Sequence, residues 1–502
     1  MNTTSPRRAI PILVGAAAAI GGAFAAFHYH RLGLTLSHYD ARGHLVVARR
    51  IFDSITPGWQ QIGAVWLPLP HLLNAIPVQV DLFYRTGASA VAISIAAFAL
   101  STSSLAWIAI RLTGSEAAGA AAAAVFALNP NVVYLQATPM TEPLLLATTT
   151  IAVALLLAWC DLAQLTPRAT NERATGWAFA LACLTRYEAW PITCAALAAA
   201  TWTLWRRGVA PVEAIRRTAR VAAYPAVAIV AFAIFSRVVV GQWLVTGGFF
   251  VPENKSLGLP WLAMKEVGWG ARMLSGTATI WIAAVGVGAM AVAGFAVARR
   301  AEALVALSLA ASAALPWSAF VDGHPFRIRY MVPLAAVEAI GAGVVAGWVR
   351  RPRFAAAAAI VLVAAFELHP LDRLAPMVVE AQWDLPNRPV RRHVTDCLAA
   401  GRDGEKIMAS MGSLGHYMQE TSTSGFSVRD FLHEGNGDIW LAALEEPRPY
   451  VGWILIEEKA EGGDMLAARA REHPHWLDGY SRVCDGAGLA LYRRNDKSKG
   501  QP

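Results

Sequence analysis

Apolar runs long enough to cross a lipid bilayer recur along the first 370 residues of this 502-residue chain. A helix needs about 20 residues to cross a hydrocarbon core of about 30 Å. The whole chain is 56% hydrophobic and only 16% charged, whereas about a quarter of a soluble domain is charged. From residue 371 onward, charged residues are interspersed as in a globular protein. We therefore expect an all-α polytopic membrane domain over 1–370 and a small α/β domain over 371–502.

The apolar runs predict about eleven membrane-spanning helices. Arg7 and Arg8 precede the first run, as in a secretory signal peptide. Because no convincing small-residue cleavage site precedes the polar segment 28–31, we interpret the run as a retained helix and keep a cleaved signal peptide as the alternative. The predicted spans are 9–27, 88–110, 117–135, 143–160, 176–185, 189–205, 221–235, 277–297, 303–320, 331–349 and 354–366.

Arginine residues gather on alternate connections between the predicted spans. They precede the first span and recur at Arg111, Arg168, Arg173, Arg206, Arg207, Arg216, Arg217, Arg220, Arg299, Arg300, Arg350, Arg351 and Arg353. Positive residues mark cytoplasmic loops, so we expect a cytoplasmic N-terminus and an extracytoplasmic C-terminal domain. We assign these arginines no other role, and since they punctuate apolar runs, the net charge of +8 does not indicate nucleic-acid binding. The Ala- and Arg-rich, Lys-poor composition indicates a bacterial cytoplasmic (inner) membrane.

The first outer connection, residues 28–87, is long for a compact protein, and such loops usually carry function. Residues 40–52 have the pattern of an amphipathic helix, and residues 65–73 form an apolar element edged by Trp66 and His71. Such an element fits the plane of the membrane interface. We expect Trp66 and His71 to contact substrate; a place in the aromatic interface belt is the alternative for Trp66.

Ionisable groups at membrane depth or at its edge are costly, so each is a functional candidate. The outward ends of the predicted spans collect both carboxylates and guanidiniums, as a site for an anionic ligand and hydroxyl chemistry would need. The candidates are Asp40, Glu142, Arg186, Glu188, Arg237, His324, Arg327, Arg329 and Tyr330.

At these positions the chain resembles the GT-C class of polytopic glycosyltransferases, close to the protein O-mannosyltransferases and the lipid A aminoarabinose transferase. The resemblance covers residues 9–366. Its ordered features are an acidic residue opening the interfacial loop (Asp40), the prolines at 68–70, the Thr-Glu-Pro-Leu segment at 141–144, a short span ending at Arg186, and the Arg-Tyr helix start at 329–330. The chain departs from such relatives at Ala41, where a second acid is common, at 65–67, which lacks a Lys, and at Arg186, where the aminoarabinose enzyme has Lys.

The resemblance implies transfer of a sugar from a polyprenyl-phosphate carrier to a hydroxyl of a glycolipid, polysaccharide or protein. It places Asp40 as general base and Glu142 as a second catalytic carboxylate. Arg186 and Arg329 would hold the lipid phosphate, because a guanidinium binds phosphate through two N–H groups and keeps its charge. Arg327, Tyr330 and Arg237 are further substrate-binding candidates.

No cofactor is required by this chemistry, since a phosphate is a tolerable leaving group. A divalent cation is therefore possible but not expected. Residues His28, His30, His38 and His44 match no strong zinc-ligand spacing, so we predict no metal site.

Each candidate also has a structural interpretation. Asp40 would cap the helix that follows it, Glu142 would be a first-turn charge at a helix start, Arg186 would extend to lipid head groups, and Arg327 and Arg329 would be interfacial anchors.

Two other functions compete with the enzyme: a secondary transporter or lipid flippase, which would show internal repeats with broken helices, and a non-catalytic envelope assembly protein.

Beyond residue 371 the pattern predicts strands at 406–410 and 451–457, a helix at 465–471 and a closing hairpin at 483–494 that turns at Asp485 and Gly486. Cys397 and Cys484 are the cysteines of this part. A disulfide between them fits an oxidising compartment. The role of this domain, in gating or in acceptor recognition, is left open.

Overall fold

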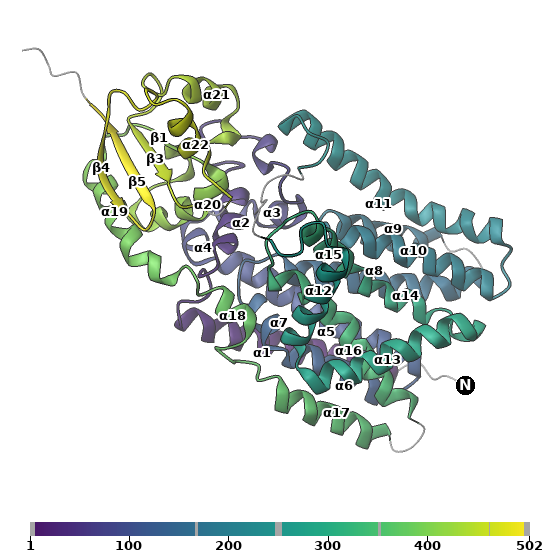
Figure 1. The fold of residues 1–502 in the computed structure, drawn as a ribbon. Helices are drawn as coiled ribbons and strands as arrows, with labels where there is room; N and C mark the ends of the chain where they lie inside the picture. The colour runs from purple at the N-terminus through teal and green to yellow at the C-terminus, as the bar shows by residue number, and fades with distance from the viewer. Residues whose placement is uncertain (1–5, 166–168, 246–253, 350–352, 461, 496–502) are drawn as a thin grey trace, which may run out of the picture.

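The computed structural model describes residues 6–165, 169–245, 254–349, 353–460 and 462–495. Arg168, Arg350 and Arg351, which belong to predicted inner loops, lie outside these ranges. Figure 1 shows two parts: a bundle of long helices and, at one end of it, a smaller part built around a sheet.

The helices of the bundle are α1 (Pro6–Arg31), α2 (Tyr39–Arg49), α3 (Leu69–Asn74), α4 (Asp81–Thr86), α5 (Ala88–Thr113), α6 (Glu116–Leu128), α7 (Pro130–Leu135), α8 (Glu142–Leu165), α9 (Ala169–Cys183), α10 (Ala189–Arg206), α11 (Pro211–Val240), α12 (Pro260–Ser275), α13 (Thr277–Ala296), α14 (Ala303–Leu307), α15 (Ala314–Val321), α16 (Ala335–Trp348) and α17 (Arg353–Glu367). Short 3-10 helices are η1 (Trp59–Ile62), η2 (Pro77–Gln79), η3 (Ala298–Arg300), η4 (Ser308–Ala313) and η5 (Ile328–Leu334).

Among the described residues, seven helical segments are long and apolar enough to cross a membrane. They are Ala9–Arg31, Ala88–Thr113, Glu142–Asp161, Pro211–Val240, Thr277–Ala296, Ala303–Val321 and Ile328–Trp348. Each coincides with one of the predicted spans, which confirms a multi-pass helical membrane protein.

The other four predicted spans also fall on helices, but on shorter ones: α6, α9, α10 and α17. The predicted span 117–135 is divided, because the side chain of Asn129 caps the new helix α7 that Pro130 opens. A total of eleven crossings therefore stays a prediction.

Two arginines of the predicted inner loops, Arg111 and Arg207, form ion pairs that the sequence did not predict. Arg111 and Arg207 each contact both Asp161 and Glu302, which closes a ring of four ion pairs. Glu142 opens α8 and Asp161 lies near its other end, so at 1.5 Å per residue they are about 30 Å apart. The ring thus ties α5, α8 and the residues beside α10 and α14 together at the bundle end remote from Glu142.

The C-terminal part contains a five-stranded sheet in the order β2-β1-β3-β5-β4. The strands are β1 (Ile407–Ala409), β2 (Phe431–Leu432), β3 (Trp453–Glu457), β4 (Tyr480–Gly486) and β5 (Leu489–Arg494), and the helices are α18 (Pro376–Glu380), α19 (Arg388–Ala400), α20 (Met411–Glu420), α21 (Asp438–Glu445) and α22 (Met465–Glu472). β1 pairs in parallel with β2 and β3, and β5 pairs antiparallel with β3 and β4.

The predicted strands, helix and hairpin of this part are confirmed, apart from the position of the hairpin turn. The turn lies at Ala487 and Gly488, not at Asp485 and Gly486. Ala487 and Gly488 have φ angles of 53° and 84°, as both central residues of a type I′ turn require. Cys397 of α19 and Cys484 of β4 form the predicted disulfide.

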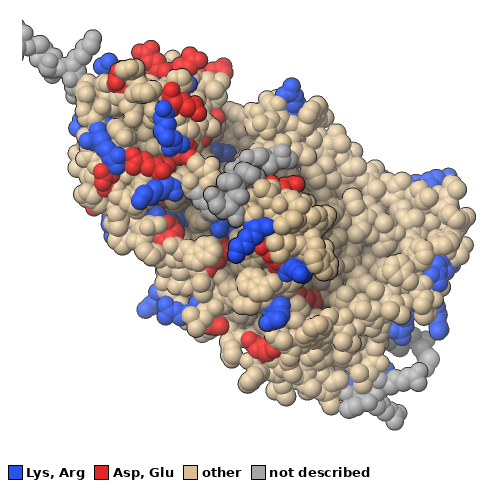
Figure 2. Space-filling view, in the orientation of Figure 1, with Lys and Arg blue, Asp and Glu red and all other residues tan. Residues whose placement is uncertain are grey.

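The interfacial loop and the C-terminal part share one hydrophobic core. Leu45 and Val46 of α2 and Tyr84 of α4 are buried together with residues such as Leu414 and Tyr417 of α20. Figure 2 shows that acidic and basic side chains gather over the sheet-containing part, whereas the visible flank of the bundle is mostly uncharged. This contrast is expected where one part faces water and the other faces lipid.

Candidate active site

Asp40 forms a buried ion pair with Arg329, which lies in η5 ahead of α16. Both side chains are about nine-tenths buried, with exposures of 12% and 9%. Asp40 does not cap α2. The cap is His38, whose Nδ1 accepts the backbone N–H of Asp40 at 3.1 Å. The Asp40 carboxylate is therefore free of a capping role and turns toward the bundle.

A second set of charged groups is built around Arg186, between α9 and α10. Its guanidinium donates to Glu188 at 2.8 Å and to the Thr141 hydroxyl at 2.9 Å, and its Nη1 lies 3.0 Å from Oε1 of Glu142. The Glu142 and Glu188 side chains are 0% and 2% exposed. Arg186 is thus held inside the protein and does not extend to lipid head groups.

The two sets interact electrostatically. Burial, the largest single effect, raises the pKa of Asp40, but the charge and close contact of Arg329 together with the smaller effects of His38 and His44 outweigh it and hold that pKa below its ordinary value. Burial also disfavours the charged form of Arg186, yet Glu142 and Glu188 raise its pKa, against an opposing effect of the nearby Arg329. Asp40, Glu142, Arg186 and Arg329 accordingly form one cluster, as the sequence analysis expects of a site.

Glu380 of α18 also belongs to this cluster. It lies beyond residue 370, and it was not predicted as a site residue. Its Oε1 lies 3.5 Å from His38 Nε2. Burial raises the pKa of Glu380, but His38, Arg329 and Arg327 bring it below the ordinary value. The only signal in the sequence is one acid in an otherwise apolar segment. Arg327 also lies over the ring of Trp383, 5.9 Å from its centre, so it belongs to the rim of the cluster.

Trp66 and His71 both contact His44, which in turn lies beside Asp40. His44 is a second residue of the cluster that was not predicted as a site residue. The Trp66 ring lies 4.1 Å from that of His44, and His71 Nε2 lies 3.1 Å from His44 Nδ1. Burial, aided by the charge of Arg50, lowers the pKa of His71 to about 3. Burial and His71 likewise lower the pKa of His44, although Asp40 opposes them. The two imidazoles are therefore neutral groups beside the carboxylate.

The remaining candidates take different positions. Tyr330 lies beneath Arg329, whose guanidinium is 5.2 Å from the ring centre, and its hydroxyl is 3.3 Å from His324 Nε2. Arg237 lies at the exposed end of α11, where it donates to the carbonyl of Gly241. Tyr330 is thus brought to the cluster, whereas contact of Arg237 with a substrate stays a prediction.

Several buried charged atoms of the cluster have unused hydrogen-bonding capacity. Within the described residues, both carboxylate oxygens of Glu142, Nε and Nη1 of Arg329, and Oε1 of Glu380 have no hydrogen-bond partner. Three of these atoms lie at ion-pair distance from a neighbour, Glu142 Oε1 from Arg186, Arg329 Nη1 from Asp40 and Glu380 Oε1 from His38, but none of these contacts has the geometry of a hydrogen bond. Buried polar groups are nearly always satisfied, so this concentration of donors and acceptors indicates a site that binds a polar ligand.

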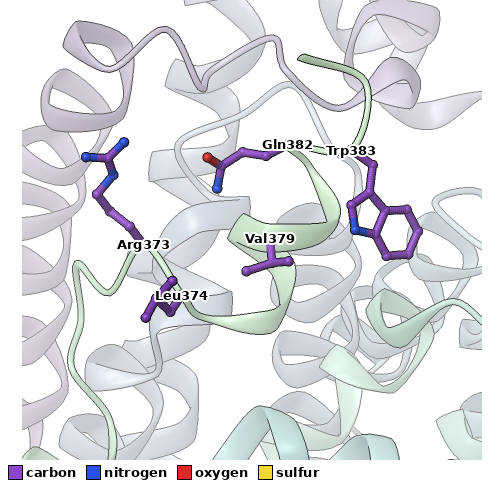
Figure 3. Close-up of a pocket in the computed structure, with 5 residues that line it drawn as sticks. All are labelled: Arg373, Leu374, Val379, Gln382 and Trp383. Carbon is purple, nitrogen blue, oxygen red and sulfur yellow. The ribbon is translucent and has the colours of Figure 1, made fainter. Parts of the chain in front are cut away.

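Two hollows lie beside the cluster. A small cavity of about 30 Å³ between α2, α3, α5 and α8 is lined by His44, His71 and Thr141 among others. A second hollow is an open cleft of about 520 Å³. Figure 3 shows Arg373 and Trp383 on opposite sides of this cleft, with Val379 and Gln382 between them. None of the predicted site residues lines the open cleft, so the chemistry is better placed at the ion-paired cluster. The cleft adjoins it through α18 and the contact of Trp383 with Arg327.

A compact group of metal-ligand side chains occurs elsewhere. Among the described residues, His393, Cys397 and Cys484 are the one set of three ligand atoms close enough to share an ion. The two cysteines are disulfide-bonded, which removes the thiolates that a metal would need.

A solved structure of a known protein has a fold similar to that of this chain. The chain matches no protein-family model, and no curated protein matches its sequence. The crystal structure of ArnT from Cupriavidus metallidurans bound to undecaprenyl phosphate is similar to it, with a TM-score of 0.56 and 14% sequence identity. The alignment covers 98% of this chain and 99% of that chain. This chain therefore has the fold of ArnT, the GT-C lipid A aminoarabinose transferase, over its full length, in agreement with the resemblance carried by its sequence motifs.

Proposed function

We propose that this protein is a glycosyltransferase that moves a sugar from a polyprenyl-phosphate carrier to an acceptor hydroxyl outside the cytoplasm. The observation that carries the proposal is the buried cluster of carboxylates and guanidiniums with unused hydrogen-bonding capacity. The fold supports the choice of donor, because the similar ArnT structure was solved with undecaprenyl phosphate.

In the proposed reaction the acceptor oxygen attacks the anomeric carbon while the bond from that carbon to the phosphate oxygen breaks. The bonding electrons leave with the polyprenyl phosphate, and Asp40 takes the hydroxyl proton. A single displacement inverts the anomeric centre. Glu142 is the second carboxylate of the site. Its Oε1 is in the ion pair with Arg186, but neither of its oxygens accepts a hydrogen bond among the described residues, so both can accept one from sugar or acceptor hydroxyls.

Arg329 and Arg186 would hold the departing phosphate. Among the described residues, Nε of Arg329 has no hydrogen-bond partner and Nη1 is held by the ion pair with Asp40, and a guanidinium presents two parallel N–H groups that match phosphate oxygens. When phosphate takes over Arg329, Asp40 loses its partner. Burial then raises the pKa of the Asp40 carboxyl, which makes it a better base. Donor binding and activation of the base are coupled in this way.

The setting proposed for this reaction is the outer face of a bacterial cytoplasmic membrane, with the N-terminus inside. The cluster lies at the same bundle end as the C-terminal part, and the loop arginines Arg111, Arg206 and Arg207 lie at the other. Positive residues mark the cytoplasmic side, so this arrangement favours an extracytoplasmic site. A transporter or flippase would instead leave lipid-linked sugar unconsumed.

The test is Asp40→Asn in full-length protein reconstituted with a polyprenyl-phosphate sugar and a membrane extract as the source of acceptors. We expect sugar release from the donor to fall about 1,000-fold or more, while the protein remains folded. The matched control is Asp81→Asn, which removes an exposed carboxylate from the same loop and should keep wild-type turnover. Near-normal turnover of the Asp40 variant would reject its role as base, and no consumption of donor by the wild type would reject the enzyme.

A further inference from the structure

The helix that carries Asp40 is also part of the C-terminal core. Leu45 and Val46 of α2 pack with Leu414 and Tyr417 of α20. The side chain of Gln419 donates to the backbone carbonyl of Tyr84 at 2.9 Å. The position of α2 is therefore determined by both parts of the protein.

Arg42 joins these parts through a buried ion pair. Its side chain is 2% exposed. Nε donates to the carbonyl of Leu36 at 2.7 Å, and Nη1 donates to Oε2 of Glu420 at 2.8 Å. A guanidinium can bridge two acceptors in this manner because its N–H groups are fixed in one plane. Arg42 consequently fixes α2 to the residues before it and to the end of α20.

Glu420 is itself held in place. Arg391 of α19 donates to the same Glu420 oxygen at 3.0 Å and makes two contacts of 2.6 Å with Asp384. The Glu420 side chain is 22% exposed and the Arg391 side chain 4%. This support means that α2 is anchored to a rigid part of the C-terminal fold.

Asp40 and Arg42 lie on opposite sides of α2. At 3.6 residues per turn, two positions along a helix differ by about 200°. Anchoring Arg42 on the C-terminal side therefore sets the rotation of α2 that directs Asp40 to Arg329 on the other side. A small rotation would be enough to separate the carboxylate from the reacting hydroxyl, and such misplacement lowers catalytic rates strongly.

We propose that Arg42 and Glu420 are positioning residues for Asp40, so that the C-terminal part is a component of the active site. The claim that they govern turnover rests on the proposed function, whereas the claim that they hold α2 does not. Neither residue contacts the cluster of reacting groups, so both act through the placement of α2.

The experiment compares Glu420→Gln with Glu458→Gln in the full chain. Glu458 follows β3 and makes an ion pair of 2.8 Å with Arg482 of β4 in the same C-terminal part, and its described side-chain contacts include no residue of α2. Hydrogen exchange is measured for the peptide 39–49, together with kcat and KM for a polyprenyl-phosphate sugar. We expect exchange in this peptide to rise at least 10-fold in the Glu420 variant. We also expect kcat to fall at least 10-fold with KM within 2-fold of wild type.

The control variant should match wild type in all three measurements. Arg42→Lys serves as the second variant, because a single ammonium cannot span Leu36 and Glu420 in the fixed geometry of the guanidinium, and we expect the same pattern. Unchanged exchange in 39–49 for both variants would overturn the proposal, whether or not the wild type transfers sugar. Raised exchange with unchanged kcat would overturn the link to Asp40 alone, and a parallel change in KM and kcat would indicate a general structural role.

Discussion

The carboxylate of Asp40 is paired with the guanidinium of Arg329 inside the protein, at a junction of the interfacial loop with the start of α16. The pairing has two opposite consequences. It keeps the carboxylate ionised despite burial, but it also makes the carboxylate a weak base while the pair persists. A phosphate that competes for Arg329 would remove this restraint, which links the donor to the base.

Arg329→Lys tests that link. Lysine keeps the positive charge but loses the planar pair of N–H groups, so it cannot hold a phosphate bidentately and release Asp40. We expect kcat/KM for the lipid-linked sugar to fall about 100-fold, which corresponds to about 2.7 kcal/mol of transition-state stabilisation. Arg85→Lys, at an exposed arginine of the interfacial loop, is the control and should have no effect. Equal kcat/KM values for the two variants would contradict the role of Arg329.

Glu142 and Glu188 flank the same arginine, but we expect different effects on kcat from them. Glu188 receives well-formed hydrogen bonds from Arg186, whereas both Glu142 oxygens are without hydrogen-bond partners among the described residues. Glu142→Gln should therefore reduce kcat about 100-fold, and it should also lower the melting temperature because it removes the buried ion pair with Arg186. Glu188→Gln should lower the melting temperature with kcat nearly unchanged, because it removes a charge-assisted hydrogen bond worth about 2 kcal/mol. A loss of kcat in Glu188→Gln with kcat retained in Glu142→Gln would show that Glu188, and not Glu142, acts on the substrate.

The ring of Arg111, Asp161, Arg207 and Glu302 should contribute stability and not activity. Glu302→Gln leaves both arginines with Asp161 as their remaining partner in the ring, at a cost of about 2 kcal/mol. We expect a lower melting temperature in detergent and unchanged turnover per folded molecule, since the ring lies about 30 Å from Glu142 along α8. Glu213→Gln, whose partners Arg216 and Arg217 lie on the same helix and are 64% and 24% exposed, should leave the melting temperature unchanged. A loss of turnover in folded Glu302→Gln protein would mean that the ring communicates with the site.

Much of the fold was predictable because the bilayer imposes a simple rule on sequence. Long apolar runs gave the seven strongest spans. The bounds of the short helices were harder to predict from the sequence. The division at Asn129 depends on a cap followed by a proline, and hydropathy alone does not register this signal. The hairpin turn was misplaced by two residues because Asp-Gly is the commoner signal, whereas the chain adopts positive φ angles at Ala487 and Gly488.

The site was predictable in part for a related reason. Asp40, Glu142, Arg186 and Arg329 were identified because charge is expensive near lipid, and the structure brings them together. His44 and Glu380 were missed, since His44 sits in an ordinary amphipathic helix and Glu380 follows the predicted membrane domain. Their place in the cluster depends on how α2 and α18 pack, which no local pattern specifies.

Buried neutral histidines should make the stability of the folded protein depend on pH. His71 and His433 are 1% and 0% exposed. Burial, aided by Arg50, lowers the pKa of each to about 3. In the unfolded chain a histidine titrates near 6.5. Between these values the unfolded state binds protons that the folded state does not, so stability decreases as pH falls below about 6.5. At pH 5 each histidine should cost about 2 kcal/mol relative to neutral pH.

His433→Asn tests this account most directly. The Nδ1 of His433 accepts the backbone N–H of Gly435 at 3.1 Å, and the amide oxygen of asparagine can take over that bond without binding a proton. We expect the drop in melting temperature between pH 7.5 and pH 5 to be smaller in this variant than in wild type. His475→Asn, at a side chain that is 92% exposed, should leave the drop as it is. If His433→Asn and wild type lose the same stability on acidification, His433 is protonated in the folded protein, and its burial does not set its charge.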